Sequence, residues 1–482
     1  MTLFVPTTHI RFDTNLERDS SNIPGAQSLK GRHVHFVGVG GSGMCGLAHM
    51  LLNEGALVTG TDRQKSDATD KLAALGIPIS YQQSAQALPQ AAELVVHSAA
   101  VRFDNPEIAE SRRRGIQTVK YAEMLGCVMN LKQGIAVSGT HGKSTTTAML
   151  SYILSRAGLD PSYVVGAACN QLGGSSHAGA GEHFVVEACE YDRSFLNLFP
   201  HMAVVLNIET DHLDYYKDID EITEAFGKLI AQVHPDGLVV TSATNKHCLW
   251  AAKSSRAPVQ TYAINAEADW SADQISRNGH IEFRVLYLGR TEARLRLGIP
   301  GLHNVGNALA AAAIARNCGV SWQVIQETIA DFRGARRRSE LLGNPNGVII
   351  IDDYAHHPTE IQATLRALRE HYNPQRLICV FQPHQHSRTR CLLDDFSRSF
   401  SQADVVIVPD IYFARDTESD CKAVNSGILV DRMRANGTNA LHIPAFPAVS
   451  DYLVSYVQSG DLVVSMGAGP VWEVTHDLVR RL

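Results

Sequence analysis

The chain has 482 residues, and at about 150 residues per domain this length predicts about three domains. Its formal net charge of -6 argues against general affinity for nucleic acids or membrane surfaces, so we expect neither as a partner. The nine cysteines form no C-x-x-C pair. This disfavours a disulfide framework or a structural zinc site and favours a reducing, cytoplasmic location.

Residues 1–30 are polar and charged, and they lack the apolar core of a secretory signal. We interpret them as an N-terminal arm. No run of eighteen apolar residues occurs in the chain, so no transmembrane helix is expected.

Residues 31–127 alternate short apolar strands with helical stretches. A helix is expected at 46–55, and strands are expected at 33–39, 56–62, 93–101 and 115–120. Such alternation predicts a mostly parallel sheet covered by helices, which is a Rossmann-like domain.

The central unit, residues 128–333, is expected to be a P-loop ATPase-like domain with a parallel sheet. Alternation around Gly289 predicts an antiparallel hairpin over 281–299, as a small annex to this domain. The other elements expected here are strands at 134–140, 183–189 and 202–208 and helices at 144–158 and 304–319.

The third unit, residues 334–482, is expected to be Rossmann-like again. Its start is marked by the basic run 333–338 and the turn-prone segment 343–347. Strands are expected within 347–358, 376–383, 403–412 and 461–469. The predicted fold class is therefore α/β with three domains.

Residues 139–144, with the sequence GTHGKS, lie between a predicted strand and a predicted helix, where backbone amides and the helix N-terminus attract phosphate. Lys143 would neutralise the β- and γ-phosphates of ATP, and Ser144 can offer its hydroxyl oxygen to Mg²⁺. Val137 stands where the full G-x-x-x-x-G-K-[ST] pattern has its first glycine, so we interpret the segment as a shortened P-loop.

Residues 38–43 fit the pattern G-x-G-x-x-G, again between a strand and a helix, and Asp62 ends the next strand, where a ribose-binding carboxylate belongs. Taken alone, the motif indicates NAD or FAD. A dehydrogenase needs no P-loop of its own, so two phosphate loops favour ATP together with a nucleotide-linked substrate. A nicotinamide-dependent oxidoreductase stays open as an alternative.

Polar side chains follow several predicted strands. Glu187 and His212 each end a strand of the central unit, where the ligand crevice of such sheets lies, and we expect both near Ser144 at a metal. Glu190 and Asp192 are weaker candidates for the same site.

The third unit begins with a polar cluster that contains Asp352, Asp353, Tyr354, His356 and His357. An active-site loop is favoured over zinc, because adjacent histidines diverge and no second ligand group appears. The basic run 336–338 is either a solvated surface or an anion clamp that faces the P-loop. The segment 384–390 follows another strand and could hold an anion such as a carboxylate.

Together these motifs resemble the Mur ligase family from about His33 to Gly469. The matching segments are GTHGKSTTT, GVGGSGM, HSAAVRFDNPEI, EACEYDRSFL, NIETDHLDYY, HNVGNALAA, FRGARRRSE, DDYAHHPTEI, FQPHQHSRTR and MGAG. The resemblance is to the alanine-adding branch. It implies an ATP-dependent ligase that joins L-alanine to the carboxylate of UDP-N-acetylmuramate through an acyl phosphate, with ATP and Mg²⁺ as cofactors. A peptide-recycling ligase of the same family is the nearest alternative, and a homodimer is an open expectation.

The resemblance also implies roles for individual residues. ATP contacts are implied for Gly139, Thr140, His141, Gly142, Lys143, Ser144, Thr145, His303, Asn304, Asn307 and Asp353. Contacts to the UDP substrate are implied for Gly38, Gly40, Gly41, Ser42, Gly43, Asp62 and Ser98. The metal is assigned to Ser144, Glu187 and His212, and the amino acid to Tyr354 and Arg388. The expected catalytic residues are Lys143, His212, Arg337, Arg338 and His356.

The chain departs from the family pattern in three segments. Ser144 stands where threonine is common, Cys189 stands where aspartate is frequent, and Gln385 stands where arginine is frequent. Serine keeps the hydroxyl group, so the ATP site is unaffected. The loss of a cation at Gln385 predicts weaker attraction for a zwitterionic amino acid.

Overall fold

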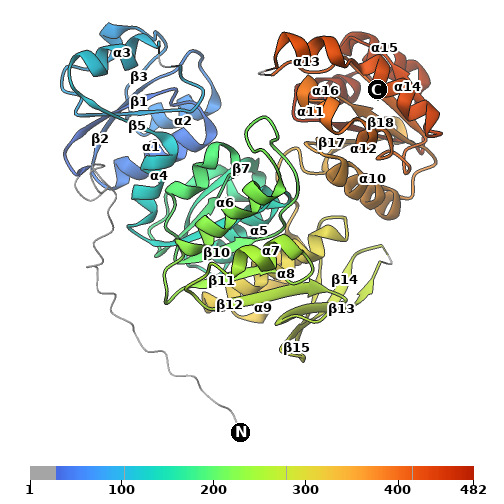
Figure 1. Cartoon of the computed structure of the whole chain (residues 1–482), viewed down its shortest axis with the longest axis horizontal. Helices are drawn as coiled ribbons and strands as arrows, with labels where there is room; N and C mark the ends of the chain where they lie inside the picture. The colour runs from blue at the N-terminus through green and yellow to red at the C-terminus, as the bar shows by residue number, and fades with distance from the viewer. Residues whose placement is uncertain (1–28, 103, 278, 415) are drawn as a thin grey trace.

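The computed structural model describes residues 29–102, 104–277, 279–414 and 416–482. These residues form three α/β lobes in chain order, and the first and third lobes flank the central one (Figure 1). The predicted N-terminal arm, residues 1–30, lies outside the described part of the chain except for its last two positions.

The first lobe is a five-stranded parallel sheet with the order β3-β2-β1-β4-β5. Two of its inner strands, His33–Val37 and Leu94–His97, are buried over most of their length because helices cover the sheet. The strands are β1 (His33–Val37), β2 (Leu57–Thr61), β3 (Ile79–Ser80), β4 (Leu94–His97) and β5 (Gln117–Lys120). The helices are α1 (Ser42–Asn53), α2 (Asp67–Ala74), α3 (Pro106–Arg113) and α4 (Tyr121–Met129).

The central lobe is a ten-stranded sheet with the order β15-β14-β13-β12-β11-β10-β6-β9-β7-β8. Its strands are β6 (Gln133–Ser138), β7 (Ser162–Cys169), β8 (Gly174–His177), β9 (His183–Glu187), β10 (Met202–Val205), β11 (Leu238–Ser242), β12 (Val259–Ile264), β13 (Trp270–Ser276), β14 (Glu282–Tyr287) and β15 (Arg290–Arg296). Its helices are α5 (Lys143–Arg156), α6 (Ile219–Ala231), α7 (Lys246–Ala252), α8 (His303–Asn317) and α9 (Trp322–Asp331). The predicted hairpin is confirmed as β14 and β15, but it continues the edge of the main sheet and is no separate annex.

The third lobe is a six-stranded sheet with the order β16-β17-β21-β18-β19-β20, parallel except for β16. Its strands are β16 (Glu340–Gly343), β17 (Ile349–Asp353), β18 (Leu377–Phe381), β19 (Val405–Val408), β20 (Ala440–His442) and β21 (Leu462–Met466). Its helices are α10 (Pro358–Tyr372), α11 (His386–Cys391), α12 (Leu393–Ser397), α13 (Glu418–Ala423), α14 (Ser426–Ala435), α15 (Phe446–Tyr456) and α16 (Trp472–Arg481). The predicted α/β class with three domains is confirmed. Among the described residues, no helix combines the length and the apolar character needed to cross a membrane.

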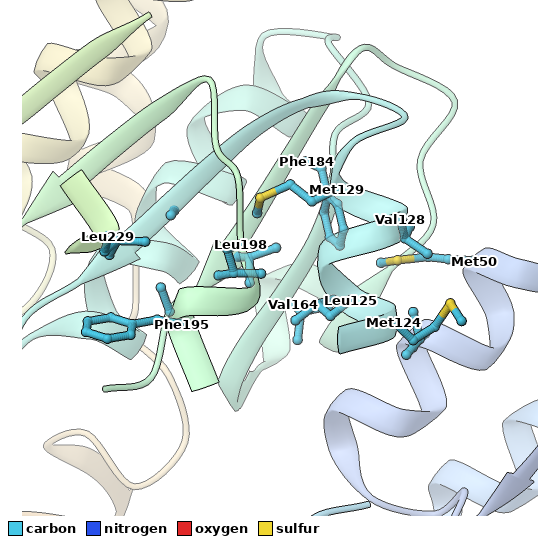
Figure 2. Close-up of a cluster of buried hydrophobic side chains, with 14 of the residues drawn as sticks. Met50, Met124, Leu125, Val128, Met129, Val164, Phe184, Phe195, Leu198 and Leu229 are labelled. Carbon is cyan, nitrogen blue, oxygen red and sulfur yellow. The ribbon is translucent and has the colours of Figure 1, made fainter. Parts of the chain in front are cut away.

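The first lobe is fixed to the central lobe by a shared apolar core. Met124 and Met129 of α4 pack in one cluster with Met50 of α1 and with Phe184 and Leu198 of the central lobe (Figure 2). The predicted domain boundary at 127/128 falls inside α4, and its exact position stays a prediction. The third lobe, by contrast, has apolar clusters of its own. Its contacts with the central lobe include the ion pairs His141–Glu360 and Arg388–Asp211, and polar interfaces of this kind favour relative motion of domains.

A buried polar pair stabilises the first lobe, and we expect Glu107→Ala to weaken it strongly. The Glu107 carboxylate is 0% exposed, and it lies 2.8 Å from His35 Nε2 and accepts from Thr61 Oγ1 at 2.9 Å. Its removal leaves His35 and Thr61 without this buried hydrogen-bond partner. The loss should lower the free energy of unfolding by about 3–5 kcal/mol. Denaturant-dependent hydrogen exchange of the β1 amides measures this loss.

The matched control is Glu110→Ala on the same helix. Glu110 pairs with Arg113, which is 73% exposed, and with Arg114, which is 23% exposed. Both guanidinium groups keep contact with water, so this loss should change the exchange of β1 less than the loss of Glu107 does. Equal losses of stability in the two variants would show that the buried pair contributes no more to stability than the surface pair.

Candidate active site

The phosphate loop, residues 139–144, joins β6 to α5 as predicted. Gly142 directly precedes α5 with φ +84°, and a Cβ at this position would stand 2.5 Å from Asn307 Oδ1. Only glycine combines this backbone conformation with so close an approach. The loop therefore packs against α8, and the N-terminus of α5 supplies backbone N–H groups for a phosphate.

The ammonium group of Lys143 is enclosed by oxygen atoms. Its Nζ donates to the carbonyl oxygens of Gly139 and Thr140 at 2.6 and 3.0 Å and to Glu190 Oε1 at 2.9 Å. Burial lowers the pKa of Lys143, but the Glu190 carboxylate outweighs burial and holds the pKa above its ordinary value. Lys143 is therefore charged at neutral pH, as stabilisation of a transferring phosphoryl group requires.

The predicted metal residues lie around the adjacent Lys143 and Ser144. Glu187 Oε1 accepts from Ser144 Oγ at 2.9 Å, and on the lysine side Glu190 Oε1 lies 3.5 Å from His212 Nε2. Burial raises the pKa of Glu190, but Lys143 lowers it further, so the carboxylate is ionised. The structure thus raises Glu190 from a weaker candidate to a central member of the site.

A cavity of about 340 Å³ opens beside the phosphate loop, between the central and third lobes. Its walls contain seven of the residues predicted to bind ATP, namely His141, Gly142, Thr145, His303, Asn304, Asn307 and Asp353. The other four, Gly139, Thr140, Lys143 and Ser144, belong to the adjoining loop. The cavity therefore supports the predicted position of the nucleotide.

Sequence reasoning missed several residues of this cavity, namely Asn207, Glu209, Tyr262, Thr359 and Glu360. Asn207 secures the phosphate loop, because its amide accepts from the backbone N–H of His141 at 2.7 Å and donates to the His141 carbonyl at 3.1 Å. Asn207 and Glu209 follow β10 closely, so their strand-end position could have indicated them.

His141 links the phosphate loop to the third lobe. Its Nδ1 lies 3.1 Å from Glu360 Oε1, and its Nε2 lies 3.4 Å from Glu209 Oε2. Burial lowers the pKa of His141, but the carboxylates of Glu360 and Glu209 raise it overall to about 9. At neutral pH an imidazolium therefore bridges the central lobe and α10.

His141, Glu209 and His357 meet one geometric condition for a metal site, since their ligand atoms lie within 4.8 Å of one another. However, His357 Nδ1 accepts from Thr359 N at 3.3 Å, and Nε2 lies 3.2 Å from the Thr210 carbonyl, to which it must donate. Both ring nitrogens of His357 are thus used, and the cluster is an interlobe polar network.

The two arginines that were predicted to be catalytic have different partners. Arg338 Nη2 lies 3.4 Å from Ser144 Oγ, so this side chain crosses from the third lobe to the phosphate loop. Arg337 donates to Asp352 at 3.1 Å and to carbonyl oxygens of the turn 467–469 at 2.7 and 3.0 Å. Arg337 therefore ties the third lobe together, and Arg338 is the better candidate for catalysis.

Three further predicted residues surround these arginines. The Tyr354 ring lies 5.1 and 4.9 Å from the two guanidinium carbons, so it helps to orient them. Burial raises the pKa of Asp353 to about 6 and lowers the pKa of His356 to about 4. His356 is therefore neutral at pH 7, and its Nδ1 lies 3.1 Å from the Tyr354 carbonyl, which leaves Nε2 as the acceptor.

Arg388 lies at the interface between the lobes, with Nη2 2.8 Å from Asp211 Oδ1. Gln385 is buried at the start of α11, and its Nε2 donates to the Ala414 carbonyl at 2.9 Å. Gln385 thus secures a neighbouring loop of the third lobe. The expected loss of amino-acid attraction at this position stays a prediction.

The glycine loop, residues 38–43, follows β1 at the point where the strand order of the first sheet reverses. Asp62 Oδ2 accepts from Gly40 N at 2.7 Å, and a Cβ on Gly40 would stand 2.8 Å from the same oxygen. Asp62 therefore holds the loop itself, and its contact with a ribose stays a prediction. All seven residues assigned to the UDP substrate gather here: Gly38, Gly40, Gly41, Ser42, Gly43, Asp62 and Ser98.

A glycine-loop lobe, a P-loop lobe and a third lobe that reaches into the P-loop define the class of three-domain P-loop nucleotide-binding proteins. Family models match all three lobes: Mur ligase family, catalytic domain, at residues 33–133; Mur ligase middle domain at 137–315; and Mur ligase, glutamate ligase domain, at 337–469. The chain belongs to the Mur ligase family.

Its relatives include the UDP-N-acetylmuramate–L-alanine ligase of Acetivibrio thermocellus, which is 44% identical over 92% of this chain and 95% of that protein. The enzyme of the same name from Caldanaerobacter subterraneus subsp. tengcongensis is 42% identical over 92% of this chain and 96% of its own. Among solved structures, the UDP-N-acetylmuramate–alanine ligase of Thermotoga maritima is 27% identical with a TM-score of 0.78, covering 93% of this chain and 98% of that one. A murein peptide ligase of Psychrobacter arcticus is 26% identical with a TM-score of 0.69, covering 94% of this chain and 98% of that one.

Proposed function

We propose that this chain is an ATP-dependent ligase that joins L-alanine to the carboxylate of UDP-N-acetylmuramate, a step of peptidoglycan synthesis. The observation that carries the proposal is the shared name of relatives that are 42–44% identical over 92% of the chain. The site supports it, because Lys143, Ser144 and Arg338 meet beside the interlobe cavity.

The chemistry explains why ATP is needed, since a carboxylate is a poor electrophile towards an amine. In the first step a carboxylate oxygen of the sugar attacks the γ-phosphorus of ATP, ADP leaves, and an acyl phosphate forms. In the second step the alanine amine attacks the acyl carbon, inorganic phosphate leaves, and the new amide nitrogen gives up a proton. Lys143 and Arg338 would offset the negative charge on the γ-phosphoryl group while it is transferred.

Mg²⁺ is proposed as the metal, held by Ser144, Glu187 and His212. The residues fit a cation, because among the described residues His212 Nδ1 and Glu190 Oε2 are buried without a hydrogen-bond partner. Hydroxyl and carboxylate oxygens suit magnesium. When bound, the ion would neutralise charge on the β- and γ-phosphates.

The substrates are assigned by the chemistry of the remaining residues. The glycine loop with Asp62 and Ser98 is proposed to hold the UDP part. Tyr354 and Arg388 are proposed to hold the amino acid, because a guanidinium matches a carboxylate in geometry. His356, neutral and with Nε2 available, is proposed to accept the ammonium proton.

The proposal is tested by phosphate release from ATP with UDP-N-acetylmuramate and one acceptor at a time. We expect release with L-alanine and weaker release with glycine or L-serine, because one methyl group discriminates by about 1–3 kcal/mol. Release with a murein peptide alone would identify a recycling ligase. Calorimetry that shows NADH binding without UDP-sugar binding would favour an oxidoreductase.

A homodimer and a cytoplasmic location stay predictions from the sequence. Sedimentation of the purified protein at several concentrations would decide the first, and fractionation of the source cells would decide the second.

A further inference from the structure

The guanidinium group of Arg388, which is proposed to bind the amino acid, forms an ion pair with a residue of another lobe. Arg388 lies on α11 of the third lobe, and Asp211 lies in the loop after β10 of the central lobe. Arg388 Nη2 donates to Asp211 Oδ1 at 2.8 Å, and the two side chains are only 9% and 8% exposed. An internal carboxylate therefore lies against Arg388 at the boundary between the two lobes.

The side chain that faces Arg388 is a buried carboxylate. Asp211 Oδ1 lies 2.8 Å from Arg388 Nη2, and the Asp211 side chain is only 8% exposed. A carboxylate is also the group that an amino acid would present to a guanidinium.

The contact uses only part of the binding capacity of Arg388. Among the described residues, the pair has one hydrogen bond, between one guanidinium nitrogen and one carboxylate oxygen. A free amino acid can instead present both carboxylate oxygens to the guanidinium fork, which is the stronger arrangement. A substrate carboxylate can therefore offer Arg388 one hydrogen bond more than Asp211 does.

Asp211 also connects Arg388 to the phosphate site. The same Oδ1 accepts from the backbone N–H of His212 at 2.6 Å, and His212 has the left-handed φ of +54°. The neighbouring residues Glu209 and Thr210 bond to Thr359 and His357 of the third lobe. Residues 209–212 thus form one segment that touches the third lobe on one side and Glu190 on the other.

We propose that Asp211 is a positioning residue that stands in for the substrate carboxylate: it holds Arg388 before the amino acid binds, and the carboxylate of the amino acid displaces it. The inference rests on the proposed function, in particular on Arg388 as the amino-acid contact. It predicts that loss of the Asp211 charge strengthens amino-acid binding, whereas loss of a purely structural support would weaken it.

The test is Asp211→Asn, which keeps the shape of the side chain and an oxygen for His212 N. We expect the KM for L-alanine to fall about five- to tenfold, the size of one lost competing charged contact, while the KM values for ATP and UDP-N-acetylmuramate change less than about twofold. The KM for L-alaninamide, which has no carboxylate, should not fall. The control Asp214→Asn removes the same charge from an exposed position of the same loop and should leave all KM values unchanged.

A rise in the KM for L-alanine in Asp211→Asn would overturn the displacement and make Asp211 a support for Arg388. A second measurement uses the unaltered protein, in case the variant does not fold. In the complex with UDP-N-acetylmuramate and a non-hydrolysable ATP analogue, L-alanine but not L-alaninamide should speed hydrogen exchange of residues 211–214. Equal exchange with both compounds contradicts the inference. If the unaltered protein releases no phosphate with L-alanine, the proposed function itself fails.

Discussion

Lys143→Met is expected to lower the turnover number by about a hundredfold or more, which corresponds to about 3 kcal/mol in the barrier. The reason is that Lys143 is the enclosed cation of the phosphate loop, 2.9 Å from Glu190 and next to Ser144. Methionine keeps the apolar stem and removes only the charge. Phosphate release at saturating ATP, UDP-N-acetylmuramate and L-alanine measures the effect.

Lys132→Met is the matched control for this substitution. Lys132 also donates to two backbone carbonyls, those of Gly179 and Gly181 at 2.6 and 2.7 Å, but it lies outside the phosphate loop. The control variant should lose some thermal stability and keep its turnover number. Near-normal turnover in Lys143→Met would remove the phosphate loop from the mechanism.

Arg338→Ala is expected to lower kcat/KM by about a hundredfold with little change in stability, because one charge contact to the phosphoryl group is lost. Its guanidinium is the side chain of the third lobe that reaches Ser144 Oγ, at 3.4 Å. Arg338→Lys should recover only part of the activity, since an ammonium group cannot reproduce the planar fork. Steady-state kinetics with L-alanine, together with thermal denaturation, measures both quantities.

Arg337→Ala provides the contrast at the neighbouring position. This substitution removes the cationic partner of the fully buried Asp352 carboxylate. We therefore expect it to destabilise the third lobe by about 3–5 kcal/mol. The two variants should thus separate catalysis from stability. If Arg337→Ala is stable and inactive while Arg338→Ala is active, the roles assigned to the two arginines are reversed.

The sequence predicted the features that are specified by residues close together in the chain. The phosphate loop and glycine loop each lie between a strand and a helix, and their residues took the expected positions because such turns are specified locally. The hairpin around Gly289 was found from its alternation alone, yet its place at the edge of the main sheet was not, since pairing of β13 with β14 adds no local signal.

The tertiary structure decided which of the polar candidates act together. By itself the sequence determined an α/β chain with three domains, two phosphate loops and a set of strand-end carboxylates and histidines. It left Arg337 and Arg338 equivalent, ranked Glu190 low and missed Asp211 and Glu360. Only the fold separates the two arginines and places Asp211 against Arg388, 177 positions away. The physical reason is that local patterns follow from hydrophobic periodicity and turn geometry, whereas contacts between buried charges on different lobes depend on how the completed sheets meet.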